Sequence, residues 1–530
     1  MNLDFSLQDV DFIPEMVKDY MLNRTKISMF FPHQDSEILN AIKLRNFDSA
    51  DRELLVDTLV EQYRNIGLEE NSLVYSNILS LKKESTFTIT TGQQIHAYLG
   101  PLYVAHKIQT TIALAAKYKE EFPEFNFVPV FWMATEDHDF EEIKDIRIWS
   151  KTYEWETESG GPVGRLNPSG LVQIGEKILE ENRFTSEQLE LIQTCIDAYA
   201  SADTLANATR AIVHSLYKHT GLVIIDPDNS TFKSQFIGVL KKEIESRFSF
   251  EPISNCNKQL KDLGYKPLLN PRKTNLFLLY NGLRQRLDYI EESNVFELSP
   301  SKVILSMENI QGIIQENIGD LSPNVVLRPL YQETILPNLA YIGGAAEVSY
   351  WLQLSDLFQT TEIPKPLLLL RKTKSYLPSK QYAKWKKLSL PDNLLLNLKQ
   401  KNKDEELLEY FQTKLKGQEE EIKVKLKELE EDIMSLVLEY TTDQLKPTKA
   451  ITKEWHKQFQ SISSLVKQSS IIRLEQEIQT AIKIHEYLFP GGVFSERFQF
   501  SVEKYLDNSI HKKFEYSEFA DLQTVSVSLT

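Results

Sequence analysis

Hydrophobic positions in the first 80 residues recur at the spacing of amphipathic helices. Leu54, Leu55, Leu59 and Tyr63, for example, are interspersed with Asp, Glu and Thr. A spacing of three or four positions puts such residues on one face of a helix. The pattern predicts an N-terminal helical segment over residues 1–80.

A different pattern begins near residue 85. Residues 85–91 are all β-branched or aromatic except Ser85 and are followed by Gly92, and residues 127–134 form a continuous apolar run. The first run is typical of a strand, and the second suits a strand buried on both faces. A helical pattern over about 103–118 lies between them. Strand, glycine turn, helix and strand form a βαβ unit, which implies a parallel sheet with its ligand site at the strands' carboxyl ends.

The later pattern divides the chain further. A Gly/Pro-rich and then helical stretch indicates an insertion, short apolar strands follow at 221–227 and 366–370, and a second insertion between them is expected to be rich in loops. The predicted segments are an N-terminal helical segment (1–80), the first half of the core (81–150), an insertion (151–215), the second half of the core (216–390) with an insertion around 250–320, a helical coiled-coil hairpin (391–489) and a C-terminal segment (490–530).

The hairpin segment carries a heptad-like pattern. Apolar residues from Leu408 to Tyr440 are separated mostly by threes and fours among Lys and Glu, which is the pattern of a coiled-coil seam. Residues 441–443 and Pro447 interrupt this seam, and a similar one restarts at Trp455. The two stripes could pack within the chain or mediate dimerisation, and we expect a homodimer.

Chain length, net charge and the lengths of the apolar runs exclude several classes of protein. A chain of 530 residues is too long for one hydrophobic core. Its formal net charge of −15 opposes a nucleic-acid-binding surface but allows a local basic pocket for a small anion. No apolar stretch approaches the roughly 18 residues of a membrane span, and residues 1–5 lack the features of a signal peptide. We therefore expect a cytoplasmic protein with neither nucleic-acid nor membrane partners, in which Cys195 and Cys256 are reduced thiols.

The first candidate site is the turn from the first predicted strand into the following helix. Free N–H groups and the dipole at a helix start favour an anion. Glycines permit close approach, glutamine and histidine donate hydrogen bonds, and a lysine adds positive charge. The Gly-Lys-Ser/Thr of a P-loop is missing, and a plain connection is the alternative. The residues concerned are Thr91, Gly92, Gln93, Gln94, His96, Gly100, Tyr103 and Lys107.

The second candidate site directly follows the apolar strand. Residues 135–142 contain five acids and one histidine. Because like charges repel, some carboxyl pKa values should rise unless a cation or a substrate ammonium neutralises them. An acidic loop that caps the next helix is the alternative, but the position at a strand end favours function. A single histidine is poor evidence for zinc, so no metal ligands are assigned.

The third candidate site combines an arginine with a glycine pair that opens a helix. Arg328 could hold a carboxylate or phosphate with two hydrogen bonds, or it could pair with Glu333 or Glu347. The residues assigned to substrate binding are Asn324, Arg328, Tyr331, Gly343, Gly344, Glu347, Tyr350 and Trp351.

A fourth cluster, Arg371, Lys372 and Lys374, follows the leucine-rich strand. Three cations so close together suit either a loop that holds a phosphate or a solvated turn. Arg284 and Arg286 form a further possible contact for an anion, of low specificity.

Several of these motifs together resemble a known family. The string Trp-Met-Ala-Thr-Glu-Asp-His-Asp over 132–139 is the most specific of them. From about residue 85 onward the chain resembles the BshC family, which adds cysteine in the last step of bacillithiol synthesis. The other blocks that fit this family are 91–94, 100–107, 327–331 and 341–351.

The resemblance implies an α/β, Rossmann-like core related to class I aminoacyl-tRNA synthetases and nucleotidyltransferases, with connecting insertions and an α-helical coiled-coil arm for dimerisation. It also implies condensation of the cysteine carboxylate with the amino group of glucosaminyl-malate. In those relatives a His-x-x-His motif would fall at residues 93–96 and a Lys-Met-Ser-Lys-Ser loop at residues 371–375. Neither motif is matched letter for letter here.

A carboxylate does not condense with an amine in water without activation, so ATP or another nucleotide is expected, and Mg²⁺ would suit the acidic loop. The predicted catalytic residues are Glu136, Asp137, His138 and Asp139. His138 is the base for the attacking amine, and the acids hold ammonium groups or Mg²⁺. Arg328 takes the malate carboxylates. The alternatives are a nucleotidyltransferase acting on a small anionic substrate and a non-catalytic coiled-coil scaffold.

Overall fold

The computed structural model describes residues 2–24, 26–27, 29–31, 38–44, 51–149, 151–398, 402–441, 443–499, 502 and 516–530. Within the chain, contacts define two compact units. The larger unit spans 4–374 and 496–526, and the smaller spans 375–495 together with 1–3 and 527–530.

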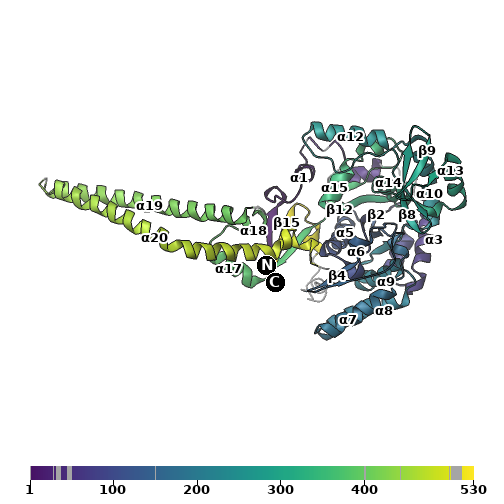
Figure 1. Ribbon diagram of the computed structural model, residues 1–530, viewed down its shortest axis with the longest axis horizontal. Coiled ribbons are helices and arrows are strands. Elements are labelled where there is room, and N and C mark those ends of the chain that lie inside the picture. Colours follow the sequence, from purple (N-terminus) through teal and green to yellow (C-terminus); the bar gives the residue numbers. More distant parts are fainter. Residues whose placement is uncertain are drawn as a thin grey trace. The chain divides into compact units, whose positions relative to one another are not determined.

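A five-stranded parallel sheet forms the centre of the larger unit (Figure 1). Its order is β13-β12-β2-β3-β6. The strands are β2 (Thr86–Gln93), β3 (Asn126–Met133), β6 (Val223–Ile225), β12 (Asn338–Gly343) and β13 (Leu367–Leu370). The chain builds one half of the sheet from β2 through β3 to β6 and then returns to the other side of β2. This doubly wound order confirms the predicted Rossmann-like α/β core.

Strands β2 and β12 are joined by hydrogen bonds between side chains as well as between backbone groups. Every residue of β2 is buried, and Thr88 and Thr90 donate from their hydroxyls to Asn338 Oδ1 on β12, at 3.1 and 2.8 Å. A buried hydroxyl without a partner would destabilise the fold. Asn338 therefore allows a threonine-rich sequence, which favours strand structure, to occupy the middle of the sheet.

Helix α5 (Leu102–Glu121) carries the chain from β2 to β3, as the sequence predicts. Its apolar face, including Ile108, Ile112 and Ala115, is buried. The other helices along the core are α6 (Phe140–Ile143), α10 (Ser230–Gln235), α11 (Ile237–Ser246), α14 (Arg328–Ile335), α15 (Ala345–Leu352) and α16 (Ser355–Gln359).

The first insertion contains one antiparallel strand pair and three helices. They are β4 (Asp145–Ile148), β5 (Lys151–Glu154), α7 (Ser169–Glu181), α8 (Ser186–Ser201) and α9 (Leu205–Tyr217). Cys195 on α8 and Cys256 on a later helix are free and buried, as expected, and burial raises the pKa of each thiol to about 12.

The second insertion contains an antiparallel sheet and two helices, so of the predicted insertion or loop-rich lobe the loop-rich alternative is wrong. Its strand order is β10-β9-β8-β7-β11. Asn281 and Gly282 both have positive φ at the turn between β7 and β8, which is the geometry that Asn-Gly favours in tight hairpins. The elements are α12 (Phe250–Asp262), β7 (Leu276–Tyr280), β8 (Leu283–Ile290), β9 (Val295–Ser299), β10 (Ile304–Leu305), α13 (Met307–Glu316) and β11 (Leu321–Pro323).

The N-terminal segment is not purely helical as predicted, because it begins with a strand. β1 (Asn2–Ser6) joins β15 (Thr524–Leu529) and β14 (Thr373–Leu377) in a three-stranded sheet of order β1-β15-β14. Five residues are too few for a periodicity that stands out from the helical background. The nearby helices are α1 (Glu15–Met21), α2 (Ile38–Leu44), α3 (Arg52–Gln62), α4 (Leu73–Ser80) and, near the other end of the chain, α22 (Tyr516–Ala520).

In the smaller unit, α19 (Lys403–Tyr440) and α20 (Leu445–Leu488) pack side by side as a helical hairpin (Figure 1). The predicted break at 441–443 separates them, although residue 442 lies outside the described residues. Leu429, Leu436 and Ile462 are about half exposed, and homodimerisation stays a prediction. Two short helices precede the hairpin, α17 (Ser379–Lys387) and α18 (Leu394–Asn397). Within the described ranges, no helix combines the length and the apolar character needed to cross a bilayer.

Candidate active site

A pocket of about 600 Å³ lies at the carboxyl ends of the five parallel strands. Each strand contributes to its lining: Gln93 ends β2, Ala134 follows β3, Pro227 follows β6, Gly344 follows β12 and Arg371 follows β13. The reversal of strand order between β2 and β12 falls in the middle of this edge. In open α/β sheets that position is where ligands bind.

Arginines dominate the charge of the pocket in a protein whose net charge is −15. Those that line it are Arg272, Arg284, Arg286, Arg328, Arg371 and Arg497. Guanidinium groups stay protonated and bind carboxylates and phosphates in a planar, two-bonded geometry. A pocket with so many of them suits a ligand that carries more than one anionic group.

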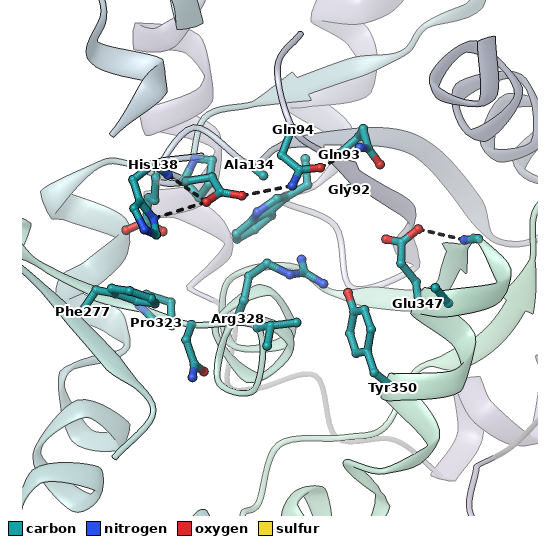
Figure 2. A pocket seen from close by; sticks show the side chains of 18 of the residues that line it. Gly92, Gln93, Gln94, Ala134, His138, Phe277, Pro323, Arg328, Glu347 and Tyr350 are labelled. Atoms are coloured by element: carbon teal, nitrogen blue, oxygen red, sulfur yellow. Dashed lines mark hydrogen bonds and ion pairs between the residues drawn. The ribbon is translucent and has the colours of Figure 1, made fainter. Parts of the chain in front are cut away.

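Side-chain hydrogen bonds join the turn after β2 to the loop after β3. Gln94 Nε2 donates to Asp137 Oδ2 at 3.1 Å and to Glu142 Oε2 at 2.8 Å. Gln93 Nε2 donates to Gln94 Oε1 at 2.7 Å and to the Tyr103 hydroxyl at 3.2 Å. Figure 2 shows the two glutamines along one side of the pocket. The first two predicted sites therefore form one surface.

Lys107 lies behind this surface rather than on it. The side chain is fully buried, and Nζ donates to the Gly92 carbonyl, to Gln93 Oε1 at 3.0 Å and to Glu347 Oε2 at 2.6 Å. All three of its hydrogens have partners within the protein. The structure therefore gives Lys107 the role of tying β2 to α15, in place of the predicted contact with an anion.

Glu347, on α15, is the partner that fixes Lys107. It also accepts from the Tyr341 hydroxyl at 2.7 Å and from the Gly344 N–H at 2.8 Å. Burial acts to raise the pKa of Glu347, but Lys107 and these hydrogen bonds outweigh burial and lower that pKa. One carboxylate thus caps the first turn of α15 and neutralises a buried ammonium.

Three other residues of this turn that were predicted to contact the nucleotide do not line the pocket. The Thr91 hydroxyl donates to the Ile342 carbonyl at 2.8 Å. His96 is buried, and burial lowers its pKa to about 4. Gly100 has φ +62°, and a Cβ there would collide with His96. These residues shape the turn.

The loop after β3 begins with the buried carboxylate of Glu136. Its Oε1 lies 2.9 Å from Lys233 Nζ, which also lies 3.1 Å from Asp228 Oδ1 and donates to the Gly319 carbonyl at 2.8 Å. Burial raises the pKa of Glu136, with Lys233 opposing that rise. The direction of this rise is the predicted one, but its main cause is burial rather than repulsion within the loop. The pairing also adds a buried lysine that the sequence alone did not single out.

Asp137 and His138 occupy the pocket wall beside Arg284. Asp137 Oδ1 accepts from the His138 backbone N–H at 2.8 Å and lies 3.9 Å from Arg284 Nη1. Burial acts to raise the pKa of Asp137, but the nearby His138 side chain, the charge of Arg284 and hydrogen bonds from the His138 N–H and from Gln94 outweigh burial and hold that pKa at about 2. The His138 ring packs 5.3 Å from the ring of Phe277. Asp137 is therefore a permanent negative charge in this wall.

Asp139 takes the alternative role of a helix cap. Its exposed carboxylate accepts from the Glu142 N–H at 3.3 Å at the start of α6, and it lies outside the residues that line the pocket. The prediction of a catalytic Asp139 is not supported by this position.

Arg328 is held by aromatic rings and by the polar side chains of Gln332 and Tyr350. Its guanidinium lies 5.4 Å from the centre of the Tyr341 ring and 5.7 Å from that of Trp351, and Nη1 donates to Gln332 Oε1 at 3.1 Å. The described residues offer its buried Nη2 no hydrogen-bond partner. A buried donor without a partner is rare in proteins, and a bound anion would satisfy this one.

Arg371 is oriented by a buried glutamate from a distant part of the sequence. Its Nη1 and Nη2 donate to the two carboxylate oxygens of Glu496 at 2.8 and 2.6 Å, and His106 Nδ1 lies 3.3 Å from the same carboxylate. Burial acts to raise the pKa of Glu496, but Arg371 and His106 outweigh it and hold that pKa at about 2. Arg371 keeps one edge toward the pocket.

The other two cations of this cluster face elsewhere. Lys372 Nζ donates to Thr524 Oγ1 at 2.6 Å, and Lys374 Nζ lies 2.6 Å from Glu518 Oε1. Residues 373–377 form β14. The cluster is therefore neither an open phosphate loop nor a solvated turn.

The structure brings most of the predicted residues together. Those that line the pocket are Gly92, Gln93, Gln94, Tyr103, Glu136, Asp137, His138, Asn324, Arg328, Gly344, Glu347, Tyr350 and Arg371. Those that do not are Thr91, His96, Gly100, Lys107, Asp139, Tyr331, Gly343, Trp351, Lys372 and Lys374. The sequence analysis missed Arg272, Phe277 and Arg497. These three belong to the second insertion and to the segment after the hairpin, whose proximity to the sheet has no local signal.

Comparison with known proteins gives a consistent result. The profile described as "Bacillithiol biosynthesis BshC, N-terminal Rossmann-like domain" matches residues 3–372. A relative from Flavobacterium johnsoniae, named "Putative cysteine ligase BshC", is 35% identical over 512 residues, which cover 95% of this chain and 94% of the relative. A protein of the same name from Staphylococcus epidermidis is 25% identical over 511 residues, covering 91% and 92% of the two chains.

Proposed function

Because the chain belongs to the BshC family of bacillithiol biosynthesis, we propose that it is a cysteine ligase that joins the cysteine carboxylate to the amino group of glucosaminyl-malate. The observation that carries this proposal is the pocket at the strand ends, in which six arginines stand beside the Glu136–His138 loop. Malate contributes two carboxylates, and both substrates contain an ammonium group. The charges of the pocket complement both kinds of group.

Activation of the carboxylate by ATP is the second part of the proposal. An unactivated carboxylate and an amine do not condense in water, so a phosphoryl or adenylyl group must first be attached to the cysteine carboxylate. The residues proposed for the nucleotide are Gln93, Gln94, Tyr103 and Arg371, at the edge of the pocket where α5 and α15 begin. The N-termini of helices favour phosphate groups.

The acceptor substrate is assigned to Arg328 and to the carboxylates of the loop after β3. Arg328, whose Nη2 has no hydrogen-bond partner among the described residues, is proposed to bind a malate carboxylate. Glu136 and Asp137 are proposed to hold the ammonium groups. When the amine attacks, a C–N bond forms, the bond from the acyl carbon to the activating group breaks, and the amine loses a proton. His138 is proposed to contact the reacting atoms.

The test is turnover by the purified protein with ATP, Mg²⁺, cysteine and glucosaminyl-malate, followed by mass spectrometry. The expected product is the cysteinyl amide, released with AMP or ADP. A stable product that contains AMP would instead indicate a nucleotidyltransferase. If neither product forms although the protein is folded, as judged by cooperative unfolding, the proposed ligase activity is contradicted.

A matched pair of variants tests the arginine assignment. Arg328→Met keeps the apolar stem but removes the charge, and it should weaken binding of glucosaminyl-malate by about 1.5–3 kcal/mol, the range for a hydrogen bond to a charged group. Arg165→Met, which removes an arginine that pairs with Asp228 outside the pocket lining, should leave that affinity unchanged. Equal effects would contradict the role of Arg328.

A further inference from the structure

Arg284 is held in one position by contacts on every side of its guanidinium group. It extends from β8 of the antiparallel sheet, where Nε donates to Ser322 Oγ at 2.9 Å and Nη2 donates to the Pro323 carbonyl at 3.1 Å. The guanidinium carbon lies 3.9 Å from the centre of the Phe277 ring. The remaining nitrogen, Nη1, lies 3.0 Å from Nδ1 of His138.

The chemistry of the two groups fixes which one donates. A guanidinium has only donors and is not deprotonated in proteins. His138 Nδ1 must therefore accept the hydrogen bond from Arg284, and it cannot carry a proton itself. The competing acceptor, Asp137 Oδ1, lies 3.6 Å from Nδ1, which is too far for a hydrogen bond.

Resting on the proposed function, we infer that Arg284 is a positioning residue that holds His138 as a neutral imidazole protonated on Nε2. His138 then donates a hydrogen bond into the pocket and does not accept a proton from it. The ring lines the pocket and its side chain is 41% exposed, and Nε2 is the ring nitrogen that Arg284 leaves available to a ligand.

This tautomer changes the role expected of His138 in amide formation. When the amine attacks the activated carboxylate, negative charge develops on the acyl oxygen, and a fixed donor beside that oxygen stabilises it. The role of base that the sequence predicts for His138 is not the one this geometry favours. The proton lost by the amine would pass instead to the carboxylate of Glu136, which lines the same pocket.

The charged groups near the imidazole come from two elements. Asp137 lies next to His138 in the same loop, and Arg284 comes from β8, where the charges of Glu136, Asp137 and Asp228 act on it. Arg284 is the one of these that contacts the ring within hydrogen-bond distance. Removing its charge should therefore allow Asp137 to favour a proton on Nδ1.

The test is the nitrogen NMR spectrum of ligand-free protein labelled with ¹⁵N in the histidine rings, near pH 7.5. The His138 signal is assigned by its loss in His138→Gln. We expect an unprotonated Nδ1 and a protonated Nε2. A ring protonated on Nδ1, or on both nitrogens, would overturn the inference whether or not the protein is a ligase.

Two variants sharpen this measurement. Arg284→Met retains the stem over Phe277 but removes the donor, and it should shift the His138 signals toward Nδ1 protonation. Arg286→Met, two positions along the same strand, removes an arginine that instead pairs with Asp288, and it should leave them unchanged. Unchanged signals in a folded Arg284→Met protein would also overturn the inference, and if that variant does not fold, the wild-type spectrum alone decides.

Turnover separates this inference from the proposed function. His138→Ala should lower kcat by about 10²–10³-fold, as expected for loss of a transition-state donor, with a smaller effect on KM. Wild-type protein with the expected tautomer but no ligase activity would refute the function and keep the assignment of the ring. An active His138→Ala enzyme with unchanged kcat would refute the donor role.

Discussion

Ion pairs occur both around the pocket and on the α19–α20 hairpin, but the two sets differ in burial and in sequence separation. Lys107 and Glu347 are 240 positions apart, and their side chains are 0% and 21% exposed. Lys425 and Glu421 are four positions apart on one helix, and both side chains are more than 60% exposed. The first pair joins two elements of the fold, whereas the second lies on the exposed surface of a single helix.

This difference decides what each pair contributes. Water and salt screen an exposed pair, so its contribution to stability is small. A buried charge that loses its partner cannot be solvated, so removing one member is strongly destabilising. Arg371 and Arg284 depend on buried partners for their orientation, so stability and ligand binding are linked at these two residues of the larger unit.

The largest change in the free energy of unfolding is expected when the Glu496–Arg371 ion pair is broken. Glu496→Gln removes the charge that holds Arg371 and should lower the free energy of unfolding by about 3–5 kcal/mol, the range for a broken buried pair. Urea denaturation measures this change. The same substitution on the hairpin, Glu421→Gln, should produce no measurable change. Similar losses in the two variants would remove the distinction between the two regions.

Lowering the pH should weaken the same ion pair by protonating the carboxylate of Glu496. The pKa of Glu496 is held at about 2 in the folded protein, below its ordinary value, so its stabilising effect is complete above about pH 5 and is lost as pH falls toward 2. The loss should be roughly 3 kcal/mol, because each pKa unit corresponds to about 1.4 kcal/mol. Unfolding free energies measured from pH 6 to 3 should therefore fall less in Glu496→Gln than in wild type.

A smaller effect is expected for the coupling between Lys107 and Glu347. In a double-mutant cycle with Lys107→Met and Glu347→Gln, the interaction free energy should be about 1–3 kcal/mol, within the range for residues in direct contact. Each single variant should also be less stable than wild type. If Lys107→Met kept full stability but bound nucleotide more weakly, Lys107 would be a ligand contact after all.

Substitutions on the hairpin should have the smallest effect on the stability of the larger unit. Replacing Leu429 and Ile433 with Lys should reduce the mass measured by light scattering from dimer to monomer, because charge replaces an apolar stripe. The thermal unfolding of the larger unit should change little. A wild-type protein that is already monomeric at micromolar concentration would contradict the predicted homodimer.

The contrast between local and distant contacts also explains what the sequence could predict. Strands β2, β3, β6 and β13, helix α5 and the hairpin helices each follow from a local period or apolar run. The Asn281-Gly282 pair is also a local signal, because Asn-Gly is typical of the tight turn of a β-hairpin. The carboxyl-end rule correctly joined Gln93, His138 and Arg371, because it depends only on strand direction.

The partners of these residues could not be predicted in the same way. Whether Lys107 faces a ligand or a buried carboxylate depends on Glu347, and the orientation of Arg371 depends on Glu496, 125 positions away. A helical pattern places a side chain on a face but does not say what covers that face. The orientation of His138 depends likewise on Arg284, from an insertion whose sheet was not predicted.

The order of the strands has a consequence for synthesis on the ribosome. Thr88 on β2 and Asn338 on β12 are 250 positions apart, and at about 5–20 residues per second the ribosome needs roughly 12–50 seconds to make that stretch. During this interval one edge of β2 lacks its neighbour, and exposed strand edges are sites of aggregation. The nascent chain should therefore depend on slow, late closure of the sheet, with chaperones protecting β2 until β12 arrives.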